Sequence, residues 1–104
     1  MFYKAKFNTP IDETILEDFN IDLDYNSVIG KEIVLFKNHE FEIERNDLGL
    51  ISEIAYCNQC VLTYNIEEIF IELLQNMIRE DDMILLFDSD GLEEELTKED
   101  LLDI

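Results

Sequence analysis

Two cysteines and one histidine are the residues whose types and spacing most directly suggest chemistry. Cys57 and Cys60 are separated by two residues, which is the spacing of half a zinc site or of a thioredoxin-type redox pair. A closed zinc site needs four ligands, and His39 brings the nitrogen and sulfur donors of the usual kinds to three at most. A redox pair belongs at the start of a helix, whereas strand and turn are expected around these residues. We therefore expect reduced, structural thiols in a β-turn rather than a metal or redox site.

Asp88 and Asp90 are the other candidates for chemistry. They follow a run of five apolar residues, and the octapeptide 84–91 resembles the first motif of the haloacid-dehalogenase-type phosphatases. The resemblance implies a small Mg²⁺-dependent phosphotransferase in which Asp88 is the nucleophile and Asp90 is the acid or base. It covers eight residues, and we expect too little chain after Gly91 for the downstream lysine and magnesium-binding acids of that family. Asp, Ser and Gly are also ordinary turn residues, so a plain turn is the interpretation we favour.

Net charge is the strongest feature of the composition. The 104 residues include 7 Lys+Arg and 26 Asp+Glu, which gives a formal net charge of −19, distributed as −6 over residues 1–52 and −13 over residues 53–104. Direct binding to nucleic acid or to an anionic membrane through a basic face is excluded, because such binding begins with cations that neutralise phosphates. No apolar run approaches the roughly 18 residues that span a bilayer, and no secretory leader is recognisable. We expect a cytoplasmic protein, in the host cell if a phage encodes it.

Hydrophobic periodicity predicts the main elements. Apolar residues recur from Ile66 to Ile78 at the spacing of one helix face, which predicts an amphipathic helix over residues 66–80. Residues 32–36 and 40–45 flank a short polar turn and predict a β-hairpin. In its second arm Phe41 and Ile43 face one way and the glutamates face the other. Further strands are predicted over residues 2–7, 50–56 and 83–87.

The remaining segments complete a predicted α+β fold. Thr9 and Pro10 are typical of a helix start, so a short helix is predicted to about Asn20, followed by an irregular connection over residues 21–30. After a turn at residues 88–91, residues 92–104 predict one acidic helix or two short ones, with Thr97 as an internal N-cap. We expect a single acidic domain over residues 1–104. It comprises a small, mostly antiparallel sheet of three to four strands, one main amphipathic helix, and shorter helices near both termini.

Carboxylates are the candidate binding groups. Glu68 and Glu72 are like-charged neighbours on the predicted helix, and residues 80–104 hold 11 acids and one lysine, so these acids are not arranged for internal salt bridges. Alternate residues of a strand lie about 6.8 Å apart, whereas one DNA strand carries a charge about every 3.4 Å, so a DNA mimic needs several acid rows on one side. The candidate partner-binding residues are Glu40, Glu42, Glu44, Glu67, Glu68, Glu72, Asp81, Asp82, Asp88, Asp90, Glu93, Glu94 and Glu95.

These observations predict a non-enzymatic inhibitor that presents carboxylates in place of phosphates. No Gly-rich phosphate loop is present in the sequence, and Ser, Cys or His nucleophile arrangements would all need the lone His39. We expect no cofactor and no metal. The expected partner is a basic nucleic-acid-binding protein such as a nuclease or a CRISPR effector, as for a phage anti-defence (anti-CRISPR) protein. The composition resembles those of DNA-mimic inhibitors and of toxin-immunity proteins.

Other functions stay open. An immunity protein that neutralises a cognate nuclease toxin would use exposed aromatics such as Tyr25, Tyr56 or Tyr64 alongside the acids. The phosphotransferase that Asp88 and Asp90 imply, and an adaptor subunit with incidental acidity, are alternatives of other classes. The acidity alone is also explained by solubility. A homodimer formed through an apolar strand edge is a further alternative.

Overall fold

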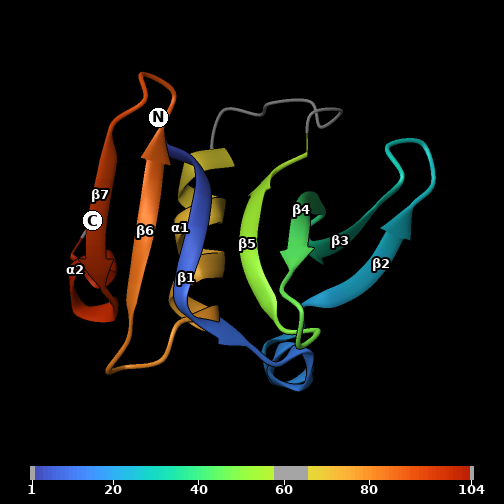
Figure 1. Cartoon of the computed structure of the whole chain (residues 1–104), viewed down its shortest axis with the longest axis horizontal. Helices are drawn as coiled ribbons and strands as arrows, with labels where there is room; N and C mark the ends of the chain where they lie inside the picture. The colour runs from blue at the N-terminus through green and yellow to red at the C-terminus, as the bar shows by residue number, and fades with distance from the viewer. Residues whose placement is uncertain (1, 58–65, 104) are drawn as a thin grey trace.

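The computed structural model describes residues 2–57 and 66–103, and within them seven strands form one antiparallel sheet. The strands follow one another in the order β2-β3-β4-β5-β1-β6-β7, so β2 and β7 are the two edges (Figure 1). The prediction of a small sheet of three to four strands packed by one main helix is therefore wrong. The strands are β1 (Phe2–Ile11), β2 (Asp22–Asn26), β3 (Lys31–Phe36), β4 (His39–Arg45), β5 (Ile51–Tyr56), β6 (Met83–Asp88) and β7 (Glu93–Thr97).

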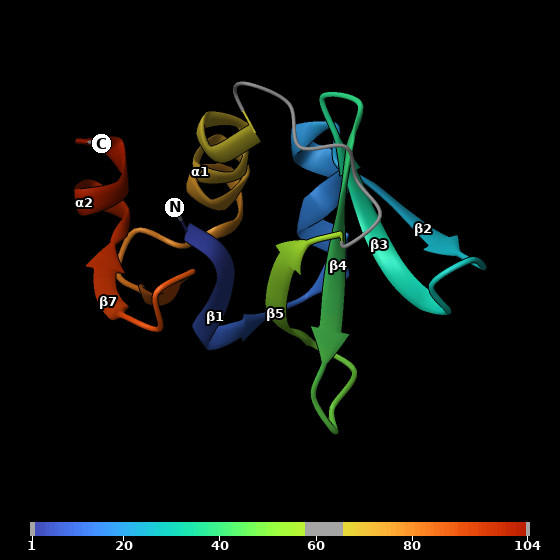
Figure 2. The same cartoon turned by 90° about the horizontal axis from the view of Figure 1, so that it is seen from above.

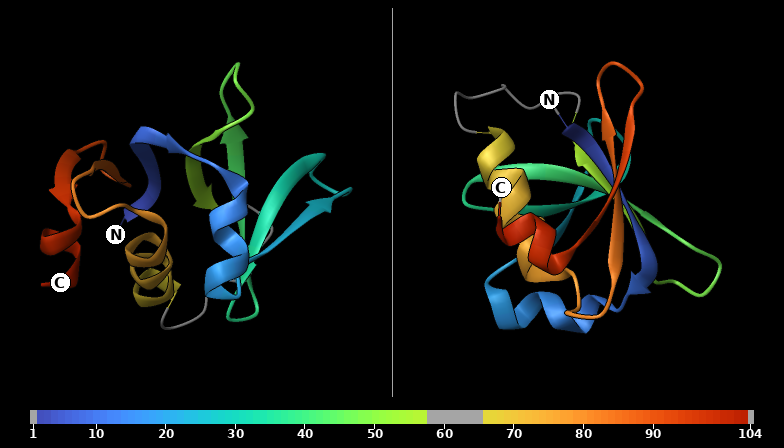
Figure 3. Two further views of the ribbon diagram at one scale, coloured as in Figure 1. Left: turned by 90° about the horizontal axis from the view of Figure 1, so that it is seen from below. Right: turned by 90° about the vertical axis from the view of Figure 1, so that its left-hand side faces the viewer.

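Three helices lie on the same side of the sheet, as Figures 2 and 3 show from above and below. They are the 3₁₀-helix η1 (Glu13–Phe19), the long helix α1 (Ile66–Met77) and the short helix α2 (Lys98–Leu102). We call this the helix side of the sheet and the opposite surface its outer face. In the described part of the chain no helix covers the outer face.

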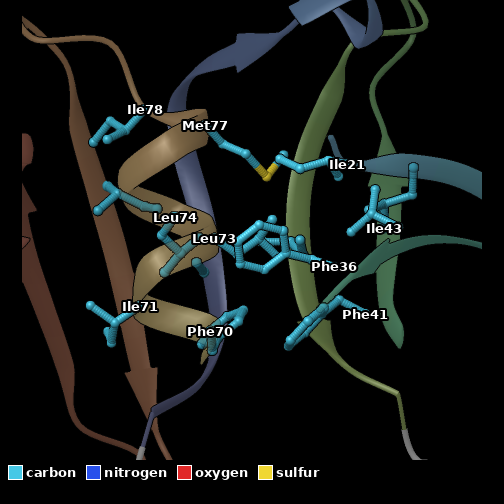
Figure 4. Close-up of a cluster of buried hydrophobic side chains, with 14 of the residues drawn as sticks. Ile21, Phe36, Phe41, Ile43, Phe70, Ile71, Leu73, Leu74, Met77 and Ile78 are labelled. Atoms are coloured by element: carbon cyan, nitrogen blue, oxygen red, sulfur yellow. The ribbon is translucent and has the colours of Figure 1, made fainter. Parts of the chain in front are cut away.

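The core lies between α1 and the sheet (Figure 4). Phe70 stacks on Phe41 with ring centroids 5.4 Å apart, and it meets Tyr56 edge-on at 4.9 Å. In Figure 4 Ile71 points to the other flank of the helix, toward β6. The apolar stripe of α1 therefore contacts both halves of the sheet. The helix predicted from residue 66 is present, and it ends at Met77.

The predicted hairpin is present as β3 and β4. Lys37 and Asn38 join the strands with φ values of 49° and 67°, the positive φ that two-residue hairpin turns require. Phe41 and Ile43 are buried on the helix side, and the glutamates of β4 lie on the outer face, as predicted. The strands predicted over residues 50–56 and 83–87 are present as β5 and β6.

β1 is longer than predicted and contains the residues expected to start a helix. Thr9 and Pro10 belong to the strand, and η1 begins after Asp12, whose carboxylate accepts a hydrogen bond from the Thr14 N–H at 3.0 Å. The pairing of β1 with β5 is irregular between Lys6 and Ile11. Proline fits such an irregularity because it has no N–H to donate, and the residue before a proline prefers extended backbone. The predicted helix start is therefore too early.

Both edge strands lie where the sequence predicts no strand. β2 falls in the segment predicted as an irregular connection, and β7 falls in the segment predicted as helix. Most of their side chains are exposed, so neither strand has the buried face that produces alternating hydrophobicity. Both are extended because their backbones pair with β3 and β6. Thr97 is nevertheless the N-cap that the sequence predicts, since it forms a reciprocal capping box with Asp100 at the start of α2.

Candidate functional site

The predicted row of acids on β4 lies on the outer face of the sheet. Glu42 and Glu44 share Lys31, whose Nζ lies 3.7 Å from Glu42 Oε2 and 3.4 Å from Glu44 Oε1. The Coulombic attraction of Glu42, followed by the hydrogen bond to Glu44, raises the pKa of Lys31. Glu40 accepts a hydrogen bond from Asn26 Nδ2 at 3.5 Å. The β4 row is thus bound by neighbouring side chains of the same protein.

The predicted acids of α1 face away from the β4 row. Glu67, Glu68 and Glu72 belong to the helix on the other side of the sheet (Figure 2). Lys37 from the β3–β4 turn reaches Glu72, and its Nζ lies 2.7 and 2.6 Å from the two carboxylate oxygens. Because the sheet separates α1 from the outer face, one flat partner surface cannot contact both acid rows.

The predicted acids around β6 lie at its two ends. Asp81 and Asp82 precede the strand, whereas Asp88 ends it and Asp90 follows, which puts roughly 20 Å between the two pairs at the rise of a strand. Asp82 Oδ1 accepts a hydrogen bond from Thr9 Oγ1 at 2.7 Å. Asp88 Oδ1 accepts one from the Asp90 N–H at 2.8 Å, and this bond is the main reason why the pKa of Asp88 is lowered. The segment after β6 therefore forms the predicted turn.

The remaining predicted acids gather beside the C-terminus. Glu93, Glu94 and Glu95 are exposed on β7, and α2 follows directly. We call residues 88–103 the C-terminal edge; it contains eight acids against Lys98, a net charge of −7. The sequence shows that the last residues contain many more acids than bases. It does not show that these acids lie at a sheet edge, because a helix was predicted where the structure has β7. The edge includes three acids that the prediction omits, namely Glu99 and Asp100 of α2 and Asp103 at its C-cap.

The ion pairs among the described residues do not involve β7 or α2. Lys4, Lys31, Lys37 and Arg45 supply the cations, and their partners belong to η1, β3, β4, β5 and α1. Within residues 2–57 and 66–103, no acid of β7 or α2 has a basic nitrogen within 4.0 Å. Among the described residues, negative charge without an ion partner therefore gathers on β7 and α2.

Arg45 forms a cluster that joins η1, β3 and the β4–β5 turn. Its Nε donates to Glu32 at 2.6 Å, its Nη2 donates to Glu13 at 2.9 Å, and its Nη1 donates to the Gly49 carbonyl at 2.6 Å. The hydrogen bond with Glu32 raises the pKa of Arg45 and lowers the pKa of Glu32. The guanidinium is occupied by acceptors of the same chain, so this cluster holds the fold together.

The cysteine and histidine donors lie in different places. Cys57 is a buried free thiol directly after β5, and Cys60 lies outside the described residues. His39 begins β4, opposite Phe36 of β3. In the ranges that the structure describes, no group of three or more His, Cys, Asp or Glu side chains is arranged to hold a metal ion.

The candidate aromatic anchors have different surroundings. Tyr25 is 60% exposed on β2, and Leu23 of the same strand and Val28 of the turn that follows it are exposed as well. Tyr56 is buried in the core, its hydroxyl has no hydrogen-bond partner in the part of the chain that the structure describes, and burial raises its pKa. Tyr64 lies outside the described residues. Tyr25 is therefore the described candidate that a partner can reach.

Comparisons with known proteins give no information on the function, so the function has to be inferred from the surface of the chain itself. No helix among the described residues combines the length and the apolar character needed to cross a membrane. The sequence matches no protein-family model, no curated protein and no solved structure.

Proposed function

We propose that the protein is a cytoplasmic, non-enzymatic inhibitor that covers the nucleic-acid-binding surface of a basic protein, such as a nuclease or a CRISPR effector. The observation that carries this proposal is the group of exposed carboxylates on β7 and α2, which have no basic nitrogen within 4.0 Å among the described residues. A channel lined with Lys and Arg for phosphates has the complementary chemistry.

The lack of ion pairs on β7, rather than the spacing of its charges, makes β7 better suited to phosphate mimicry than β4. On the outer face of β4, neighbouring glutamates lie about 6.8 Å apart, because side chains alternate between the two faces. Glu93 and Glu95 of β7 also lie about 6.8 Å apart on the outer face, and Glu94 lies on the helix side. Two of the β4 glutamates share Lys31, whereas the β7 glutamates have no basic nitrogen within 4.0 Å among the described residues, so their charge is left for a partner.

The C-terminal edge is also held in a fixed position. Leu101 is fully buried, and Gln75 Nε2 of α1 donates a hydrogen bond to its carbonyl at 2.8 Å. At the start of α2, Thr97 and Asp100 bond reciprocally. A surface that is ordered before binding loses less conformational entropy in the complex, which supports its use as a binding surface.

The proposal predicts a partner whose capture depends on salt and on nucleic acid. The tagged chain is incubated with lysate of candidate hosts at about 50 mM and about 500 mM salt, and bound proteins are identified by mass spectrometry. We expect nucleic-acid-binding proteins that bind at low salt, elute at high salt and are displaced by added DNA or RNA. A salt-resistant partner that does not bind nucleic acid, or no partner at all, would contradict the proposal.

A second candidate function, an immunity protein for a nuclease toxin, is favoured by the exposure of Tyr25 on β2. Exposed aromatic anchors dominate many interface energies. Tyr25→Ala should weaken such a complex by about 2 kcal/mol or more, whereas an inhibitor that binds through the C-terminal edge should tolerate it. Titration calorimetry with the captured partner separates the two functions.

A further inference from the structure

The β2 edge has a backbone that another strand can pair with. β2 is the last strand of the sheet on the side opposite β7 (Figure 1). The Tyr25 N–H donates a hydrogen bond to Asp24 Oδ1 at 2.8 Å, so this N–H points away from β3. In an antiparallel pair, residues alternate between bonding the neighbour and pointing outward, so the backbone groups of Leu23 also point outward.

The side chains of β2 separate apolar and acidic surfaces. Leu23 and Tyr25 are 37% and 60% exposed and lie on the helix side, in register with Val34 and Glu32 of β3. Asp22 and Asp24 lie on the outer face, and within the described residues neither has a basic nitrogen within 4.0 Å. An added strand would therefore meet apolar side chains on one face and carboxylates on the other.

A hollow of about 470 Å³ lies at the start of this edge, between η1 and β2. Leu16, Ile21 and Leu23 supply its apolar surface, and Glu17, an exposed acid among its lining residues, has no ion pair among the described residues. Lysine and arginine combine an apolar stem with a charged tip. The hollow is thus suited to one long basic side chain.

We propose that the β2 edge binds an extended segment of a partner protein, in which basic and apolar residues alternate, by adding that segment to the sheet as an eighth strand. Strand addition supplies backbone hydrogen bonds, and alternate side chains supply specificity. A lysine or arginine of the segment occupies the hollow beside η1. This surface lies at the opposite edge from the C-terminal edge, and the inference does not depend on the function proposed above.

A second copy of the chain fits the β2 edge poorly. In an antiparallel pair of β2 strands centred on Asp24, the two Asp24 side chains face each other, and a pair centred on Leu23 places Asp22 opposite Asp24. Like charges directly opposite are destabilising, and each copy carries a net charge of −19. Charge therefore favours a basic segment as the occupant.

The test uses a capped heptapeptide of alternating lysine and valine, added to the isotopically labelled full chain. Backbone amide shifts should move at Leu23 and Tyr25, and they should also move in a variant with glutamine at positions 93, 94 and 95. A matched peptide with proline in place of each valine has the same charge but cannot form the backbone bonds, and it should leave these amides unchanged. Asp22→Asn and Asp24→Asn should each lower the peptide affinity about two- to fivefold.

Three results would overturn the inference. Equal shifts with the proline peptide would show that charge alone attracts the peptide. Shifts confined to residues outside β2 would place the binding site elsewhere. Concentration-dependent shifts of Leu23 and Tyr25 without peptide would identify a second copy as the occupant. Loss of peptide binding at β2 leaves the C-terminal edge untested, so the two proposals fail independently.

Discussion

The two edges of the sheet differ in their chemistry (Figure 1). β7 presents three consecutive glutamates and is followed by the acidic helix α2, whereas β2 presents Leu23 and Tyr25 beside two aspartates. Exposed strand edges invite pairing with other chains unless charge, proline or a covering element prevents it. Dense charge at β7 opposes apolar partners and favours a cationic surface. The sparser charge at β2 leaves room for an added strand.

The two edges are also held to the core in different ways. The β7 edge is fixed by α2, whose Leu101 is buried and whose backbone is bonded by Gln75. At the other edge β2 pairs with β3, which is tied through Glu32 and Arg45 to β4 and to η1. An apolar contact therefore dominates at one edge and an ion cluster at the other, and substitutions should affect the two edges differently.

The largest effect is expected at the apolar contact of the β7 edge. Leu101→Ala should lower the free energy of unfolding by about 2–5 kcal/mol, because it leaves a cavity where a fully buried side chain lies. Leu102→Ala is the matched control, since Leu102 is 61% exposed and its loss should cost less than about 0.5 kcal/mol. Urea denaturation measures both. Equal effects would show that α2 is not docked through Leu101.

A smaller effect is expected at the ion cluster near the β2 edge. Arg45→Met keeps the apolar stem and removes the bonds to Glu13, Glu32 and the Gly49 carbonyl, so it should cost about 1–2 kcal/mol of unfolding free energy. Lys37→Met removes the half-exposed pair with Glu72 and should cost less than about 1 kcal/mol. Denaturation curves that show the reverse order would refute the structural role of Arg45.

Between the edges, the hydroxyl of Tyr56 is buried without a hydrogen-bond partner among residues 2–57 and 66–103. Tyr56→Phe should therefore raise the free energy of unfolding by about 1 kcal/mol, because an unsatisfied polar group leaves the core. Tyr25→Phe, at the exposed β2 edge, should change it by less than about 0.5 kcal/mol. A thermal melt that shows Tyr56→Phe to be destabilising would mean that the hydroxyl has a partner.

The smallest effect is a pH dependence at the β2 half of the sheet. The hydrogen bond from Arg45 lowers the pKa of Glu32 from its ordinary value of 4.5, so ionised Glu32 adds stability above that value. This stability is lost as the pH falls through the folded-state pKa, and solvent screening keeps it small because Glu32 is 38% exposed. The stability difference between the wild type and Glu32→Gln should shrink from pH 7 to about pH 3. A pH-independent difference would contradict this assignment.

Burial explains which elements the sequence predicts. α1 and the strands β3 to β6 each bury apolar side chains, so their hydrophobicity follows the period of the helix or strand. β2 and β7 are mostly exposed and depend on backbone pairing, which leaves no pattern in the side chains. Their omission from the prediction, together with the helix start placed at Thr9 and Pro10, made the predicted sheet too small.

The candidate surfaces were predictable in composition but not in arrangement. The count of acids locates the negative charge in the last residues, and that count needs no structure. Contacts between distant residues decide which acids are paired, as when Arg45 reaches Glu13 at 2.9 Å across 32 positions. The sequence also does not show on which side of the sheet each row of acids lies. In the structure Glu72 of α1 lies on the helix side and Glu42 of β4 lies on the outer face.

Binding through the C-terminal edge is tested most directly by displacement of labelled nucleic acid from one captured basic partner, measured by fluorescence anisotropy. The edge variant carries Glu93→Gln, Glu94→Gln and Glu95→Gln. A control variant of the same net charge carries Asp18→Asn, Asp47→Asn and Glu80→Gln at exposed positions elsewhere. The edge variant should displace the nucleic acid at least about tenfold more weakly than the wild type, and the control should stay within about twofold. Equal weakening of both variants would contradict binding through this edge.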